Sequence, residues 1–284
     1  MEERERERET HTSRDRVYSF PINLETINKV TGYDLSPQAA KNYLQPKQIE
    51  AKNFEEHAIA RFGRKFYELF IKGYTEKQWG EDPRNLPASI IKRIPIRFDY
   101  NDSSTESIYQ GIPEEGYTEI VKKMLNHRQI EIRLKTEFTR DMENQFERIF
   151  YSGPIDAYYD YCFGRLGYRT VEFERHETIG DYQGCAMMNF PDKNIPWTRI
   201  TEHKHFTPWE KHEHTIYFKE FSKETGPKDV PFYPKRLKED LEKLTKYQLI
   251  SNPKVTFIGR LGTYRYLDMH IVIKESIAQH RPSE

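Results

Sequence analysis

Residues 255–269, VTFIGRLGTYRYLDM, form the stretch that decides the expected fold. Val255–Ile258 is short and rich in β-branched and aromatic side chains, which favours a strand. Gly259 and Gly262 follow, and Asp268 then marks the start of a helix, because a carboxylate is stabilised at a helix N-terminus. A strand that passes into a helix through such a turn lets a ligand approach backbone N–H groups. This is the most site-like local pattern in the chain.

Helix signals occur both before and after the middle of the chain. Ser36 and Asn53 are predicted N-caps, and the helix that starts at Asn53 is expected to end at Gly73. Two further helices are expected, over Thr118–Leu125 and after Pro234. The chain therefore contains several helices that are separate from the strand-to-helix turn.

Strand-like segments with alternating or β-branched residues fill the middle of the chain. Besides the one at Val255–Ile258, they are Ile130–Leu134, Ile149–Ser152, Thr170–Glu174, Ala186–Phe190 and Thr215–Phe221. Helices come first, then mostly strands, then helix, strand and helix. This order predicts an α/β or α+β fold with a mixed β-sheet.

The composition excludes several classes of protein. The 284 residues include 45 basic and 45 acidic side chains, a balance that does not suit a nucleic-acid-binding protein. The sequence has no apolar run long enough for a membrane span or a secretory signal. Cys162 and Cys185 cannot form a disulfide framework, so we expect a cytoplasmic protein. Residues 1–16 are almost all charged and are expected to form a disordered tail.

An aromatic cluster formed by Phe70, Tyr74 and Trp79 is the first candidate for ligand binding. Aromatic faces stack on nucleobases and on sugar C–H groups. The alternative is that Phe70 belongs to the core and Trp79 packs over a loop, and the residues alone favour this alternative.

A basic cluster is the second candidate. Lys92, Arg93 and Arg97 occur in IIKRIPIRF, and an arginine offers a bidentate fork to phosphate. A basic strand edge explains the same pattern equally well.

The segment PWTRITEHKHF, residues 196–206, is the third candidate. It holds Arg199, and on a strand His203 and His205 would share one face, a spacing that suits a metal together with a carboxylate such as Glu202. A second histidine pair, His212 and His214, follows, with Glu213 as another carboxylate. Because charged residues surround both pairs, a solvated face is the favoured interpretation and we expect no metal. The sequence also lacks the glycine-rich dinucleotide, Walker-type, G-x-S-x-G and H-E-x-x-H motifs. The residues themselves thus predict an aromatic and arginine-rich pocket for an anionic, nucleotide-like ligand.

At these motifs the sequence resembles the UDP-galactopyranose mutase family, flavoenzymes that interconvert UDP-galactopyranose and UDP-galactofuranose. The resemblance runs from about Tyr18 to Ile277 and is most specific in GYTEKQWG, LPASIIKRIPIRF, YSGPIDAYYDYCFGRLGYRT, GDYQGCAMMNF, PWTRITEHKHF and GRLGTYRYLDM. It implies FAD as cofactor. In the implied mechanism, N5 of the reduced flavin forms an adduct with the sugar, UDP leaves, the sugar ring opens and recloses, and UDP returns.

The resemblance also implies residue roles on the substrate side. Tyr74 resembles the residue that stacks on uracil, with Phe70 beside it, and Trp79 resembles the tryptophan of a mobile, lid-like segment. Arg93 and Arg199 resemble the two arginines that hold the diphosphate. Two planar forks suit a group with two negative charges.

Further roles concern the sugar, the phosphates and the flavin. Asn189 resembles an asparagine near the sugar, and Tyr233 and Tyr266 resemble tyrosines that reach the phosphates. The residues that resemble the strip lying against the flavin are Gly259, Arg260, Tyr266, Leu267, Asp268 and Met269. In this interpretation residues 17–92 form a helical substrate and lid domain, and residues 93–284 form a mixed-sheet domain that faces substrate and flavin.

Two features depart from the family pattern. The glycine-rich βαβ unit that binds the FAD diphosphate is missing, so the Rossmann-like part is incomplete and we expect a truncated mutase with weak FAD binding on its own. Ser103, Ser104 and Thr105 stand where the family has an aromatic pair, so one phosphate contact is expected to be lost. The alternatives are an inactive UDP-sugar-binding module and one half of a split mutase, with a homodimer or a separate FAD-binding chain as partner.

Overall fold

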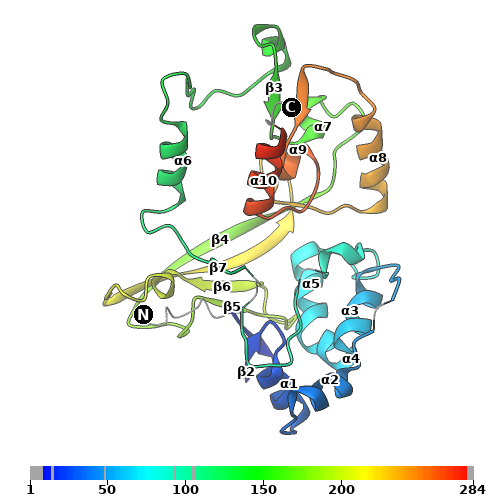
Figure 1. Ribbon diagram of the computed structural model, residues 1–284, viewed down its shortest axis with the longest axis vertical. Coiled ribbons are helices and arrows are strands. Elements are labelled where there is room, and N and C mark those ends of the chain that lie inside the picture. The colour runs from blue at the N-terminus through cyan, green and yellow to red at the C-terminus, as the bar shows by residue number, and fades with distance from the viewer. Residues whose placement is uncertain (1–8, 14–15, 48, 93, 104–106, 280–284) are drawn as a thin grey trace.

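The computed structural model describes residues 9–13, 16–47, 49–92, 94–103 and 107–279. They form two lobes, one built on a seven-stranded sheet and one on a two-stranded sheet (Figure 1). The mixed α/β fold expected from the sequence is confirmed. Among the described residues, no helix combines the length and the apolar character that crossing a membrane requires.

The seven-stranded sheet has the strand order β2-β1-β5-β6-β7-β4-β8. Its longest strands, β4 (Tyr168–Ile179) and β7 (His214–Glu224), pair antiparallel. The shorter members are β1 (Glu9–Ser13), β2 (Arg16–Phe20), β5 (Met187–Asn189), β6 (Arg199–Glu202) and β8 (Tyr233–Pro234). All contacts are antiparallel except that between β1 and β5. The sheet thus brings the N-terminal hairpin beside strands from the middle of the chain.

Strand β1 corrects one expectation. A disordered tail was expected over residues 1–16, yet residues 9–13 pair with β2 on one side and with β5 on the other. The alternating β-branched Thr10 and Thr12 favour a strand. Thr10 also places its hydroxyl 3.3 Å from Cys185 Sγ. Residues 1–8 lie outside the described residues.

The first lobe carries five α-helices on its sheet: α1 (Leu24–Thr31), α2 (Pro37–Leu44), α3 (Phe54–Phe62), α4 (Arg64–Phe66) and α5 (Lys72–Trp79). The predicted N-caps are confirmed, since Ser36 and Asn53 each accept a bond from a backbone N–H three residues on. The expected helix end at Gly73 is wrong. Helix α3 stops at Gly63, and a π-helix over Tyr67–Ile71 leads directly into α5, which continues through Gly73.

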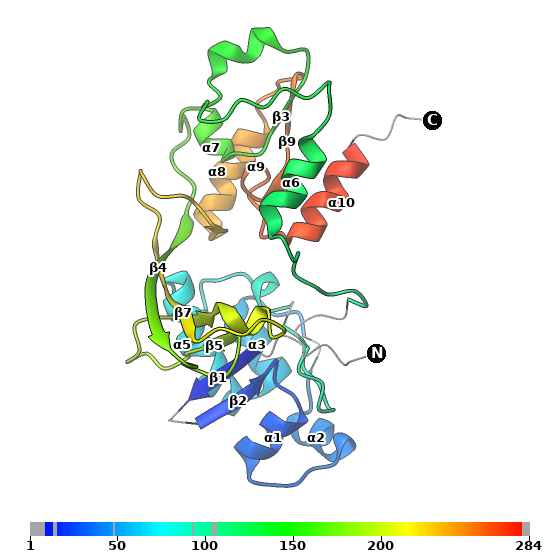
Figure 2. The ribbon, with the colours of Figure 1, turned by 90° about the vertical axis from the view of Figure 1, so that its left-hand side faces the viewer.

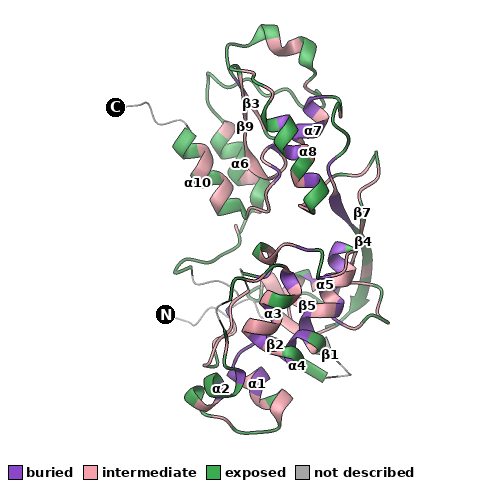
Figure 3. Cartoon of the chain, turned by 90° about the vertical axis from the view of Figure 1, so that its right-hand side faces the viewer, coloured by how far each residue is buried: buried purple, intermediate pink, exposed green. Residues whose placement is uncertain are grey.

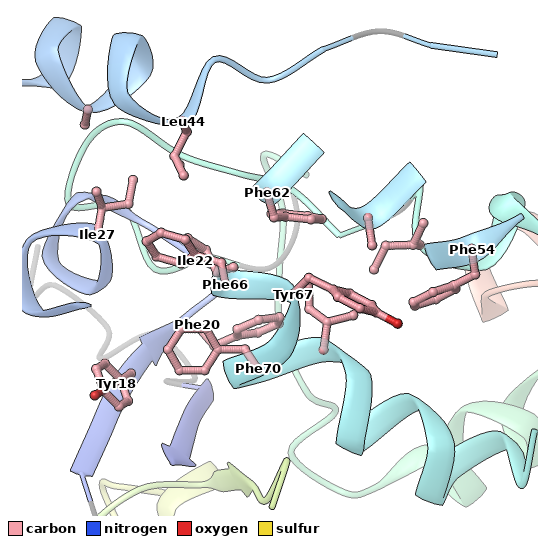
Figure 4. Packing of buried hydrophobic residues seen from close by; sticks show 14 of the residues in the cluster. Tyr18, Phe20, Ile22, Ile27, Leu44, Phe54, Phe62, Phe66, Tyr67 and Phe70 are labelled. Carbon is pink, nitrogen blue, oxygen red and sulfur yellow. The ribbon is translucent and has the colours of Figure 1, made fainter. Parts of the chain in front are cut away.

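The core of the first lobe is largely aromatic (Figure 4). Phe62, Phe66 and Tyr67 are almost completely buried, and Phe20 and Ile22 from the start of the chain pack with them. Ring edges meet ring faces here, as between Tyr18 and Phe70, whose centroids are 5.0 Å apart. This packing fixes the helices over the sheet and so fixes the direction in which α5 leaves the core.

The second lobe has a small parallel sheet of β3 (Ile149–Tyr151) and β9 (Val255–Phe257). Both strands were predicted from the sequence, but their pairing was not. Around it lie α6 (Tyr117–Leu125), α7 (Ile155–Tyr158), α8 (Lys238–Gln248), α9 (Gly259–Gly262) and α10 (Met269–Gln279) (Figure 2). Helices α6 and α10 contain no buried residue, whereas α7 and α8 contribute to a second core (Figure 3).

The strand expected over Ile130–Leu134 is wrong. These residues form turns and irregular backbone, and the Leu134 side chain is 82% exposed. An alternating pattern forms a strand only where a neighbouring strand pairs with it, and none of the described strands pairs with this segment.

Candidate functional site

The candidate site lies where α5 meets strands β5, β6 and β7. Arg199 is the first residue of β6, and in the sheet register it lies opposite both Asn189 of β5 and Glu220 of β7. Its Nε donates to Asn189 Oδ1 at 3.0 Å, and its Nη2 donates to the Tyr74 hydroxyl on α5 at 3.1 Å. One guanidinium therefore joins the helix to two strands.

A buried carboxylate lies on the far side of Arg199. Glu220 is 6% exposed, and its Oε1 lies 3.4 Å from the hydroxyl of Thr198, which can donate to it. The arginine thus has a carboxylate neighbour in the sheet.

Three aromatic rings pack together near Arg199, and the two tyrosines among them, Tyr233 and Tyr266, are called the tyrosine wall below. Tyr233 and Tyr266 stack with ring centroids 5.6 Å apart and an interplanar angle of 15°. Trp79 lies against both rings at 6.3 and 6.2 Å. Its side chain is only 6% exposed, so in this arrangement it packs inside the protein. Of the three, the two tyrosines are the more accessible, since both are half-buried.

Burial raises the pKa of Tyr233 to about 12, and the carboxylate of Glu220 and the phenol of Tyr266 act in the same direction. The positive charge of Arg199 opposes them. Tyr233 therefore keeps its proton at neutral pH and can donate a hydrogen bond to an anionic ligand. Tyr233 is thus close enough to Arg199 and Glu220 for their charges to act on its phenol.

Arg260 contacts both rings of the tyrosine wall and the backbone just before α10. Its guanidinium carbon lies 4.6 Å from the ring centre of Tyr266 and 5.6 Å from that of Tyr233. Its Nε and Nη2 donate to the carbonyl of Leu267 at 3.1 and 2.6 Å. The exposed residues Asp268 and Met269 follow directly, at the start of α10. Arg260 is thus a cation that holds the tyrosine wall and the beginning of α10 together.

Lys77 extends from α5 toward the loop that joins β5 to β6. Its Nζ donates to four backbone carbonyl oxygens at 2.5–3.0 Å, those of Phe190, Asp192, Ile195 and Trp197. The loop begins after Asn189 and ends before Arg199, so both of its ends carry side chains of the site. Lys77 was not among the site residues predicted from the sequence.

Known proteins share both the sequence and the fold. The family model for UDP-galactopyranose mutase matches residues 69–266. A probable UDP-galactopyranose mutase of Klebsiella pneumoniae is 46% identical over 272 residues, which cover 94% of this chain and 71% of the relative. The chain belongs to the UDP-galactopyranose mutase family.

Two further relatives refine this placement. A dTDP-fucopyranose mutase of Escherichia coli is 42% identical over 278 residues, covering 93% of this chain and 74% of that protein. A crystal structure of reduced UDP-galactopyranose mutase superimposes with a TM-score of 0.62 at 14% identity, over 92% of this chain and 72% of that one, and so shows the same fold. The chain is thus related to nucleotide-sugar mutases of more than one named substrate.

The structure brings together most of the residues that the family resemblance singled out. Tyr74, Asn189 and Arg199 are joined by hydrogen bonds, and the tyrosine wall lies beside them. Phe70 is 1% exposed and packs in the aromatic core, which agrees with the alternative interpretation that it is a core residue. The contact of Phe70 with a base stays a prediction. Arg93 lies outside the described residues, as do Ser104 and Thr105.

The histidine segment differs from its expected geometry. His203 and His205 lie on a 3₁₀ turn (His203–Phe206) instead of sharing a strand face. His205, Asp181 and Glu202 do place ligand atoms within 4.8 Å of one another. However, the oxygens of buried Glu202 already accept from the backbone N–H groups of Tyr182 and Gln183, and the Lys204 ammonium lies beside the group. Glu202 therefore connects the turn at Tyr182 and Gln183 to the end of β6.

Proposed function

We propose that this mutase-family chain binds a nucleoside-diphosphate galactose and interconverts its pyranose and furanose forms. The observation that carries the proposal is that Arg199 is hydrogen-bonded to both Tyr74 and Asn189. An aromatic ring, a guanidinium and an amide are therefore next to one another. An aromatic ring suits a pyrimidine base, and a guanidinium suits a diphosphate. In this proposal residues 17–92 supply the base-binding side and residues 93–284 the diphosphate side.

The roles of the residues follow from their chemistry. Arg199 neutralises the diphosphate as it leaves the sugar and holds it in place for its return. The phenols of Tyr233 and Tyr266 donate to the phosphate oxygens, and Asn189 orients the sugar. Arg93 is proposed as the second diphosphate-binding arginine. No protein nucleophile is required in this scheme, because the cofactor of the family supplies one.

The strip from Gly259 to Met269 suits one side of a flavin. It runs from the stacked tyrosine wall to the exposed first residues of α10, an eleven-residue helix whose N-terminal N–H groups can face the electron-rich edge of the ring system. Gly259 has a φ of 71°, which favours glycine at that turn. Reduced FAD, when bound, supplies the nucleophile for the anomeric carbon.

Titration calorimetry with UDP tests the nucleotide-binding half of the proposal. Turnover of UDP-galactofuranose with reduced FAD then tests catalysis, with any separate FAD-binding chain supplied if the chain alone is inactive. Binding of UDP without turnover under either condition would identify an inactive UDP-sugar-binding module. Failure to bind UDP would contradict the proposal.

A dTDP-sugar is the second candidate substrate, because a relative of 42% identity is named a dTDP-fucopyranose mutase. The bases differ by one methyl group, which a stacking tyrosine does not distinguish. Titrations with UDP and dTDP in parallel decide between them. We further propose a reducing cytoplasm as the location, supported by the free thiols of Cys162 and Cys185. A homodimer or a complex with a separate FAD-binding chain is tested by light scattering.

A further inference from the structure

We infer that Lys77 is a positioning residue, which sets the separation between Tyr74 and Arg199 by holding the β5–β6 loop against α5. The inference rests on the proposed function, because it gives Lys77 a role in the nucleotide site. Lys77 lies three residues after Tyr74 on the same helix, and its Nζ is bonded to a loop that ends directly before Arg199. The two ligand-binding groups are therefore fixed through one side chain as well as through their own bond.

The β5–β6 loop forms few backbone hydrogen bonds within itself. Pro191 and Pro196 lack backbone N–H groups, and a proline cannot donate to a neighbouring carbonyl. Within the loop, the Ile195 N–H donates to Asp192 O at 3.2 Å, and the Phe190 N–H donates to Thr198 O at 2.9 Å, which joins the two ends of the loop. Four of its carbonyl oxygens instead converge on the Lys77 ammonium, at positions 190, 192, 195 and 197. Bonds to a charged donor are stronger than bonds between neutral groups, so this ammonium is a strong attachment of the middle of the loop to α5.

Helix α5 is itself fixed to the sheet, so Lys77 has a rigid base. Arg169 of β4 donates to the C-terminal carbonyls of α5, from Nε to Gln78 O at 3.1 Å and from Nη2 to Lys77 O at 3.2 Å. The Ser222 hydroxyl of β7 donates to Gln78 O at 2.6 Å. Any shift of the loop relative to α5 is therefore a shift of the loop relative to the whole sheet.

The charge of Lys77 is sensitive to mildly alkaline pH. Burial lowers its pKa to about 8, and the carboxylate of Asp192 acts in the opposite direction. The four carbonyl oxygens also act in the opposite direction, because they bind the charged form. The other charged groups nearby are Lys193 of the loop, which forms an ion pair with Glu76 of α5, and Arg169 of β4, which donates to the Lys77 carbonyl. The ammonium shares three N–H groups among the four carbonyls, and the neutral amine has only two and no charge, so loss of the proton loosens the loop.

Three proteins test the inference: the unchanged chain, Lys77→Met and Lys65→Met. Lys65 is the matched control, because it is an exposed lysine of the preceding helix that donates to one carbonyl, Val30 O. Binding of UDP and of uridine is measured between pH 7 and pH 9. Backbone hydrogen exchange is measured without ligand, with the β4 and β7 amides as the internal check of folding.

We expect Lys77→Met to lower UDP affinity about tenfold at pH 7 and to leave uridine affinity within about twofold, because the diphosphate contact is the one displaced. The unchanged chain should lose UDP affinity with a midpoint near pH 8, and Lys77→Met should lack this step. Exchange should accelerate over residues 190–199 only. Lys65→Met should behave as the unchanged chain.

Equal losses for UDP and uridine in Lys77→Met would overturn the inference. Unchanged exchange over residues 190–199 would overturn it without reference to any ligand. If the unchanged chain binds no UDP, the proposed function fails, and the exchange measurement still decides whether Lys77 holds the loop. The two failures are thus distinguishable.

Discussion

Arg199 Nη2 donates to the Tyr74 hydroxyl at 3.1 Å, across 125 positions of sequence. The bond makes the cationic group and the aromatic group of the site interdependent. The guanidinium and the phenol ring therefore lie side by side in the site. This pair is therefore the first place where substitutions should discriminate between parts of a nucleotide.

Arg199→Lys should weaken UDP binding by about 1.5–3 kcal/mol, because an ammonium cannot reproduce a bidentate fork and the bonds to Asn189 and Tyr74 together. Titration calorimetry measures the change. Arg175→Lys is the control, since Arg175 lies on β4 and its only described ion pair is with Glu177. Unchanged affinity in Arg199→Lys would exclude this arginine from the diphosphate site.

Tyr74→Ala should weaken UDP binding by about 1–3 kcal/mol more than it weakens pyrophosphate binding, because base stacking is lost. Both ligands are titrated against the same preparation. Tyr43→Ala, which removes an exposed tyrosine of α2, should change neither affinity. Equal losses for UDP and pyrophosphate would show that Tyr74 serves only to support Arg199.

Gly73→Ala should destabilise the chain by about 1–3 kcal/mol even though alanine is the better helix former. A Cβ at Gly73 would lie 2.1 Å from the carbonyl oxygen of Pro191, so the β5–β6 loop has to move. Urea unfolding measures the stability. Gly111→Ala, where no atom lies within 4 Å of the added Cβ, should be neutral. Equal stability of the two variants would contradict the close approach of α5 and the loop.

Tyr233 should make the free energy of unfolding decrease as the pH rises above 10. Its folded pKa of about 12 exceeds the ordinary value of 10.0, so between these values the folded chain keeps a proton that the unfolded chain has lost. The free energy of unfolding should therefore fall by about 1–2 kcal/mol more in the unchanged chain than in Tyr233→Phe as the pH rises from 10 to 12. Unfolding by urea at both pH values measures this difference. An identical loss in both proteins would contradict the raised pKa.

Local features of the fold could be predicted because short-range bonds determine them. Ser36 and Asn53 each satisfy an N–H group of their own first helical turn, and that pattern is visible in the sequence. The end of the first long helical segment could not be predicted in the same way. The π-helix over Tyr67–Ile71 is stabilised by packing of Phe70 and Tyr67 in the core, so that Gly73 continues the helix instead of ending it.

The candidate site could not be predicted from local sequence patterns alone. Tyr74 and Arg199 approach only because α5 packs on the sheet, and the residues alone gave no reason to pair them; the family resemblance did. The sequence does contain a signal for Lys77, which is the glycine at position 73 inside a helix. A glycine inside a helix indicates the close approach of another backbone, and Gly73 lies one turn before Lys77 on the same face.

The four carbonyl oxygens around Lys77 have a wider consequence. Main-chain oxygens that surround a single positive charge are the ligands with which proteins replace the water shell of a potassium ion. In this chain the charge is covalently tethered to helix α5, so at neutral pH the carbonyl oxygens of the β5–β6 loop bind a cation that belongs to the protein itself. The order of this part of the protein should therefore not vary with the monovalent ions of the surrounding solution.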